Sequence, residues 1–369
     1  MAQQHLDPPT GPASGPVAGE AVADYLRSQA TEFLRSLRQH RETGADGAGA
    51  ARARTRSGEG GAEESGDAAR ALRRSARRIS GTLHTFRPLL DADWSERMRP
   101  ELAWLSGTLA REHAYAARLD RLLFALHRLS GSPVLPAQST RAADSAGGGP
   151  RAQLTAPDRG SLTVGAAKAG ALLERQLTLA RTRAHSAALQ ALGSSRFHAV
   201  ADSVALLASE VPLTPAAATA DLHPLAAAAE ERLDDAIAAL PLVTAGHPYN
   251  AEALIHGLSP DPAPHPQDAP WHQVRLLLRL HRYAREVLDG EHGGHSDPGG
   301  RLPAAGQALN RHRDASEAAA AAAAAARTPR IAPATAYALG VLHADQRHEV
   351  EAARFAFQQS WQKQVVPTR

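Results

Sequence analysis

Cysteine is absent from this chain of 369 residues, and aromatic side chains make up only 4% of it. The absence of cysteine excludes disulfide bonds, thiolate metal sites and cysteine nucleophiles. Alanine and leucine dominate the composition while runs of β-branched residues stay short, which favours helices over strands. The chain also lacks an apolar run of about 18 residues, the length of a membrane-spanning helix, so we expect no membrane span.

Lysine is nearly as scarce as cysteine. Lys168 and Lys363 are the two lysines among 41 Lys+Arg residues, so the other 39 (41 − 2) are arginine. Arginine presents a planar fork of N–H donors that matches the oxygens of phosphate. A GC-rich codon bias would also raise the arginine count, together with alanine, glycine and proline. The positions of the arginines, more than their number, therefore decide whether they form a binding surface.

The N-terminal segment, Met1 to Pro16, has no basic region followed by an apolar core. We therefore expect no signal peptide. The absence of cysteine is compatible with a reducing compartment. Together these features predict a cytoplasmic protein.

Helical periodicity extends through most of the chain, and no segment has the alternating pattern of a strand. We predict an all-α protein with a disordered N-terminal tail at 1–16, a first helical half at 17–129 that contains a loop at 41–66, a linker at 130–160, and a second helical half at 161–365. The linker is rich in glycine, proline, serine and alanine, which interrupt helices. Within the halves, helices are expected at about 17–40, 67–90, 94–129, 162–192, 196–209, 217–240, 270–290 and 333–364.

The helix predicted at 67–90 has a basic face. This first stripe consists of Arg70, Arg73, Arg74, Arg77 and Arg78. Residues at i, i+3 and i+7 share one helical face. The opposite face has the pattern of a core, with Leu72, Ala76, Ile79, Leu83, Phe86 and Leu90. Asp67 is placed to pair with Arg70, but the other four arginines have no acidic residue three or four positions away, so we expect a ligand or another helix to neutralise them.

A second stripe consists of His272, Arg275, Arg279 and Arg282. Its first three members have the same i, i+3, i+7 register as Arg70, Arg73 and Arg77, which indicates an internal duplication. Glu286 lies on the same face and is placed to pair with Arg282. The apolar residues around this stripe predict a largely buried helix, in which a row of cations must line a cavity or meet counter-charges.

Five segments together resemble the CHAD domain family, in which each half contains a helix of the form His-x-x-Arg-x-x-x-Arg/Lys-Arg-x-Arg. The segment WHQVRLLLRLHRYAREVL (271–288) resembles the helix of the second half, and RALRRSARRISGTLHTFRPLL (70–90) resembles that of the first. Further resemblance lies in ELAWLSGTLAREH (101–113), LQALGSSRFHAVADSVALLASEVPL (189–213) and ADQRHEVEAARF (344–355). The chain departs from the family pattern at Arg70, which replaces the histidine, and at Ser80, Ala114 and Leu280.

The resemblance implies two pseudo-symmetric antiparallel helical bundles around a basic central cleft that binds inorganic polyphosphate. Carried onto this chain, the predicted polyphosphate-binding residues are Arg70, Arg73, Arg74, Arg77, Arg78, His272, Arg275, Arg279 and Arg282. The departure at Arg70 keeps the positive charge but not a titratable one. The implied partners are polyphosphate or polyphosphate granules, with no cofactor and no metal.

No catalytic motif accompanies these stripes: GxSxG, HExxH and P-loop patterns do not occur, and neither does an E-x-E-x-K signature. Catalysis on phosphate would need carboxylates for metal ions, and none cluster near the basic segments. We therefore expect a binding protein and no enzyme. Two alternatives remain open at this point: a nucleic-acid binder, since phosphate contacts are generic, and a helical scaffold whose basic faces pair with acidic helices.

Overall fold

A computed structural model describes residues 18–49, 60–131, 157–246, 265–292 and 301–362. Within these ranges the secondary structure is helical, and the β-type pairing consists of one isolated bridge between Leu90 and Leu213. The predicted all-α class is confirmed. The tail predicted at 1–16 and most of the linker predicted at 130–160 lie outside the described residues.

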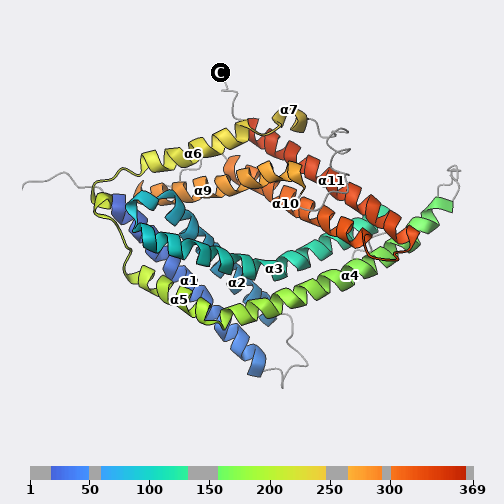
Figure 1. The fold of residues 1–369 in the computed structure, drawn as a ribbon, viewed down its shortest axis with the longest axis horizontal. Coiled ribbons are helices and arrows are strands. Elements are labelled where there is room, and N and C mark those ends of the chain that lie inside the picture. Colours follow the sequence, from blue (N-terminus) through green and yellow to red (C-terminus); the bar gives the residue numbers. More distant parts are fainter. Residues whose placement is uncertain (1–17, 50–59, 132–156, 247–264, 293–300, 363–369) are drawn as a thin grey trace, which may run out of the picture. The chain divides into compact units, whose positions relative to one another are not determined.

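The described residues form long helices together with shorter helical segments (Figure 1). In chain order they are α1 (Ala18–Gly49), α2 (Gly60–Thr85), η2 (Arg87–Leu89), α3 (Ala92–Ser130), α4 (Pro157–Leu192), α5 (Ser195–Ser209), η3 (Pro215–Ala218), α6 (His223–Ala238), α7 (Leu242–Ala245), η4 (Pro266–Asp268), α9 (Ala269–His292), α10 (Arg301–Ala326) and α11 (Pro333–Gln362).

The helices form two compact units, each made of three segments of the chain. The first unit comprises 1–110, 188–234 and 277–298, and the second comprises 111–187, 235–276 and 299–369. Helix α9 contributes its N-terminal part to the second unit and the remainder to the first. The boundaries predicted for the two halves, 17–129 and 161–365, and their pseudo-symmetry remain predictions.

In the first unit, α1 packs along α2 and α5 (Figure 1). Its core contains the fully buried side chains of Phe33, Leu72, Ile79, Phe86 and Phe197. Three of these come from the apolar face predicted for the arginine-bearing helix. Burial of each large apolar side chain contributes about 1.5–3 kcal/mol, so this face fixes how α2 sits in the unit and which way its other face points.

In the second unit, α10 packs along α11. The buried face of α10 is made mainly of alanine, with Ala315, Ala318, Ala322 and Ala325 fully buried. Small side chains allow two helices to approach closely, because interaxial distance depends on the side chains at the contact. Helix α10 is absent from the sequence prediction, because a uniform alanine run has no periodic pattern even though alanine is the strongest helix former.

The loop predicted at 41–66 is shorter in the structure. Helix α1 continues to Gly49 and α2 begins at Gly60, and the residues between them lie outside the described part. The glycines that suggested a loop cost a helix only about 1 kcal/mol each. The alanine and glutamate residues of the same stretch are strong helix formers and offset that cost.

Candidate anion-binding site

Helix α2 positions the first group of predicted binding residues. Its inner face is fully buried at Leu72, Ala76, Ile79 and Leu83. Of the predicted binding arginines, Arg70 and Arg74 are exposed, and Arg73, Arg77 and Arg78 are partly buried. The helical period of 3.6 residues explains this division, because residues of the inner face recur every three or four positions.

Two ion pairs that the sequence predicts are present in the first unit. Arg70 pairs with Asp67 one turn before it on α2. Arg282 Nε lies 3.3 Å from Glu286 Oε1 one turn after it on α9. Both pairs are local to one helix, which is why sequence spacing alone can predict them.

Arg78 has an acidic partner that the sequence spacing does not predict. Its Nε donates to Glu286 Oε2 at 2.8 Å, and its Nη2 donates to Oε1 at 3.4 Å. The hydroxyl of Tyr25 on α1 also donates to Glu286 Oε2, at 2.7 Å. Glu286 is thus shared by two arginines and one tyrosine from three helices.

The ring of Tyr283 lies against the two arginines that share Glu286. The guanidinium carbon of Arg78 is 5.9 Å from the ring centroid and that of Arg282 is 5.2 Å from it. Gly81 on α2 leaves room for this ring, because a Cβ there would lie 2.6 Å from Tyr283 Cδ2. The ring faces two cations, which its negative π-face stabilises.

The shared carboxylate changes the acidity of its partners. Burial alone would lower the pKa of Arg78, but the hydrogen bond and charge of Glu286 outweigh it and raise this pKa. Burial also raises the pKa of the Tyr25 hydroxyl, and the charge of Glu286 raises it further. Arg78 is therefore always charged and Tyr25 stays a hydrogen-bond donor at any physiological pH.

The second unit contains His272 and Arg275 at the start of α9. Arg275 Nε donates to Asn310 Oδ1 of α10 at 2.8 Å. The ring of His272 meets that of His312 edge to face, with centroids 5.5 Å apart. Burial lowers the pKa of His272 below its usual value, and the charge of nearby Arg275 lowers it too, while Asp268 opposes them.

The nine predicted binding residues fall into two groups. His272 and Arg275 belong to the second unit, while Arg279, Arg282 and the α2 arginines belong to the first. Within each group the residues lie on one or two helices whose packing in their own unit is defined. The central cleft that the family resemblance implies stays a prediction.

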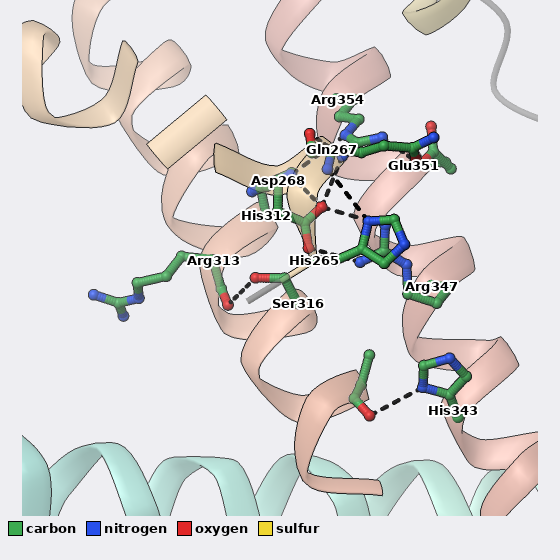
Figure 2. A network of polar contacts seen from close by, with 11 residues as sticks. His265, Gln267, Asp268, His312, Arg313, Ser316, His343, Arg347, Glu351 and Arg354 are labelled. Atoms are coloured by element: carbon green, nitrogen blue, oxygen red, sulfur yellow. Dashed lines mark hydrogen bonds and ion pairs between the residues drawn. The ribbon is translucent and has the colours of Figure 1, made fainter. Parts of the chain in front are cut away.

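The second unit contains a buried polar cluster that the sequence analysis missed (Figure 2), and its His312 ring is the one that His272 meets edge to face. Asp268, the last residue of η4, accepts two hydrogen bonds from Arg347 of α11, at 2.7 and 3.2 Å. Arg354, two turns further along α11, donates to the same carboxylate at 2.7 Å. Each of these three residues is at most 5% exposed. A carboxylate accepting from two buried arginines anchors the start of α9 on α11.

Arg354 connects the cluster to its surroundings. Its Nη1 donates to Glu351 at 2.7 Å, and its Nη2 also donates to the backbone oxygen of Gln267 at 3.0 Å. Its guanidinium carbon lies 5.3 Å from the ring centroid of Trp271, the residue before His272. The ring of His312 stacks on that of Trp271, with centroids 5.6 Å apart. The cluster and the aromatic rings beside it thus fix the first turn of α9.

The cluster perturbs its titratable groups strongly. Burial lowers the pKa of His312 to about 4, and the charge of Arg354 adds to this, while Asp268 opposes it. Burial alone would raise the pKa of Asp268, but the hydrogen bonds and charges of His312 and Arg347 hold it well below its usual range. At neutral pH the cluster therefore contains a charged Asp268 and a neutral His312.

A sequence signal for part of this cluster exists. Arg347, Glu351 and Arg354 are spaced i, i+4, i+7, so they share one face of α11. Charges on one face that alternate in sign are more often a solvated surface, which is why this pattern alone did not single them out. The partner Asp268 is distant in sequence and sits beside prolines in a turn.

The described part of the chain shows neither a metal site nor a membrane span. Within it, no group of three or more histidine or acidic side chains is arranged to hold a metal ion. None of the helices described is long and apolar enough to cross a membrane.

An all-α fold with arginine-bearing helices α2 and α9 is the architecture expected of a CHAD domain, and the sequence profile of that family matches residues 46–323. The chain belongs to the CHAD domain family. Among solved structures it is similar to PptA from Streptomyces chartreusis, with 67% sequence identity and a TM-score of 0.72. The alignment covers 94% of this chain and 99% of that one. No curated protein matches the chain.

Membership of this family suggests polyphosphate binding, because CHAD domains are polyphosphate-binding modules and are not known as enzymes. The matched range includes both predicted stripes, 70–78 and 272–282.

Proposed function

We propose that this protein binds inorganic polyphosphate without transforming it. The binding residues would be Arg70, Arg73, Arg74, Arg77 and Arg78 of α2 and His272, Arg275, Arg279 and Arg282 of α9. The observation that carries the proposal is the CHAD match at 46–323, which spans both of these helices.

The chemistry of the side chains supports the same ligand. Each guanidinium offers several N–H donors in a fixed plane, and charge-assisted bonds to phosphate oxygens are about twice as strong as neutral ones. The buried inner face of α2 leaves its arginines on the other side, spaced along about two helical turns. A flexible chain of phosphates matches such a row of cations better than a compact anion does.

The acidic groups near these residues favour binding over catalysis. Asp268 accepts from Arg347 and Arg354, and Glu286 accepts from Arg78 and Tyr25. Carboxylates that are already hydrogen-bonded to arginines are poorly placed to hold the metal ions that phosphoryl transfer uses. We therefore propose a non-catalytic role, and propose association with polyphosphate granules as its cellular consequence.

The test is titration of the purified protein with a long polyphosphate chain at low and at moderate salt. Affinity is expected to fall steeply with salt, because each phosphate contact releases a counterion. A single-stranded oligonucleotide of the same charge serves as the control for generic phosphate binding. Equal affinity for both would favour the nucleic-acid alternative, and no binding of either at low salt would favour a structural scaffold.

Incubation of the complex also tests the non-catalytic part of the proposal. The length distribution of the polyphosphate, resolved on a gel after incubation with and without a divalent cation, should stay unchanged. Progressive shortening of the chains would contradict it.

A further inference from the structure

Glu286 occupies hydrogen-bond donors that a bound phosphate would use. Its carboxylate accepts from Arg78 Nε at 2.8 Å and lies 3.3 Å from Arg282 Nε. Both arginines are among the proposed polyphosphate-binding residues. The Tyr25 hydroxyl donates to the same carboxylate at 2.7 Å and so helps to hold it in place.

The group is reachable from solvent. The side chains of Arg78 and Glu286 are 29% and 28% exposed, and that of Arg282 is 49% exposed. Arg78 and Arg282 both face the Glu286 carboxylate, so their guanidinium groups are already arranged around one oxyanion, and Tyr283 lies against both of them. An incoming phosphate oxygen therefore finds the two donors preorganised but in use, since a carboxylate and a phosphate accept the same forked bonds from arginine.

We propose that Glu286 is an internal competitor for the polyanion, holding Arg78 and Arg282 in the free protein and being displaced from them when polyphosphate binds. The inference rests on the proposed function. It assigns to Glu286 a role in setting the affinity for polyphosphate. A ligand must either displace the carboxylate or bind with this negative charge next to its phosphates, and both make the free energy of binding less favourable.

A purely structural ion pair makes the opposite prediction. If Glu286 served only to order the two arginines, its loss would disorder them and weaken binding along with stability. If it competes with the ligand, its loss weakens the fold but strengthens binding. The two measurements should therefore change in opposite directions.

The test variant is Glu286→Gln, which removes the charge and keeps the shape of the side chain. We expect its affinity for long polyphosphate to rise by about tenfold, the effect of removing about 1.4 kcal/mol of like-charge repulsion. The slope of the logarithm of the binding constant against the logarithm of the salt concentration should also become steeper. The expected change is about 0.7 for each further phosphate that an arginine neutralises, the value for single-stranded polyanions. The melting temperature should fall, because Arg78 loses a half-buried partner.

Glu101→Gln is the matched control. Glu101 pairs with Arg196 in the same unit through two bonds, at 2.6 and 3.1 Å, and is 33% exposed, but this pair joins α3 to α5, and neither helix carries a proposed binding residue. We expect this variant to lose some stability while its affinity stays within about twofold of the wild type and its salt slope does not steepen. This control distinguishes the effect of removing a carboxylate charge next to the binding arginines from the effect of removing a carboxylate charge elsewhere in the unit.

Tyr25→Phe provides a second variant if Glu286→Gln does not fold. Without the hydroxyl, Glu286 is held by fewer bonds and is easier to displace, so affinity should rise by a smaller factor, about twofold to threefold. Unchanged or weaker binding in the folded variants, with wild-type binding intact, would overturn the role of Glu286 alone. Failure of the wild type itself to bind polyphosphate would instead overturn the proposed function.

Discussion

Asp268 and Arg347 form a bidentate ion pair in the interior of the second unit. Arg347 Nη1 and Nη2 donate to the two oxygens of the carboxylate at 2.7 and 3.2 Å, and both residues are 2% exposed. Asp268 directly precedes α9, the helix of His272, while Arg347 lies within α11. The pair thus anchors the start of a proposed ligand-binding helix to the core of its unit.

Removal of the Asp268 charge should destabilise the protein strongly. In Asp268→Asn, Arg347 stays buried without the carboxylate it is paired with and Arg354 keeps Glu351, and breaking a buried pair on one side costs about 3–5 kcal/mol. The free energy of unfolding, measured with denaturant, checks this. The control is Asp24→Asn, which removes the exposed partner of Arg27 and should cost at most about 1 kcal/mol. Equal losses in the two variants would contradict a structural role for Asp268.

Acid should destabilise the fold through His312. Its pKa is lowered to about 4 by burial, from an ordinary value of 6.5. Between these values the unfolded chain binds a proton that the folded protein does not, so the free energy of unfolding falls as the pH falls through this window. The loss approaches about 3 kcal/mol at its lower end, since each pKa unit corresponds to about 1.4 kcal/mol.

Denaturant unfolding at a series of pH values from about 7 down to about 4.5 measures this slope, and His312→Asn should flatten it. Asp268 acts in a separate, lower pH range. Because its pKa is lowered in the folded protein, the stability that it contributes is present above its ordinary pKa of 3.8 and is lost as the pH falls below that value. A slope that His312→Asn leaves unchanged would show that another group is responsible.

The sequence predicted those parts of the structure that depend on local spacing. The core face of α2, the pair between Arg70 and Asp67, and the pair between Arg282 and Glu286 all follow from the period of one helix. The family was recognisable because several segments occur in the right order, even though Arg70 replaces a histidine of the pattern.

The contacts that the sequence did not predict join residues far apart in the chain. Arg78 and Glu286 are separated by 208 positions and Asp268 and Arg347 by 79, so no search at i±3 or i±4 finds them. Both contacts depend on which helices pack together, and that is decided by the apolar faces of several helices at once. An acidic partner for the arginines was expected in general terms, but its identity needed the fold.

Arg275 and Arg279 offer a direct test of the proposed ligand. We predict that Arg275→Ala and Arg279→Ala each weaken polyphosphate binding by about 1.5–3 kcal/mol, the usual value of a hydrogen bond to a charged group. That loss corresponds to roughly tenfold or more in the dissociation constant, which titration calorimetry resolves. Arg27→Ala, which removes an exposed arginine of α1 paired with Asp24, is the control and should bind nearly as the wild type does.

The same variants distinguish ligand binding from a structural role. If these arginines bind the ligand, each loss should weaken affinity while the fold survives and the melting temperature shifts only slightly. Unchanged affinity combined with a large drop in melting temperature would favour a scaffold in which these arginines brace the helices.

The last prediction concerns the pH dependence of binding. Burial lowers the pKa of His272 below 6.5, so the ring is mostly neutral at neutral pH and gains its charge on acidification. A protonated ring attracts a polyanion, and binding should therefore tighten as the pH falls below this value. Arg70 occupies the corresponding position of the first stripe and stays charged throughout.

Exchanging the two residue types should exchange the two behaviours. His272→Arg should bind polyphosphate more tightly than the wild type near pH ~8 and lose most of the pH dependence, because arginine is charged over the whole range. Arg70→His should bind more weakly near pH ~8 and acquire a pH dependence that the native first stripe lacks. Titrations of both variants between about pH 8 and about pH 5 test this. If neither profile differs from that of the wild type, His272 contacts His312 for packing alone, and the shared register of the two stripes reflects inherited helix geometry without a shared ligand.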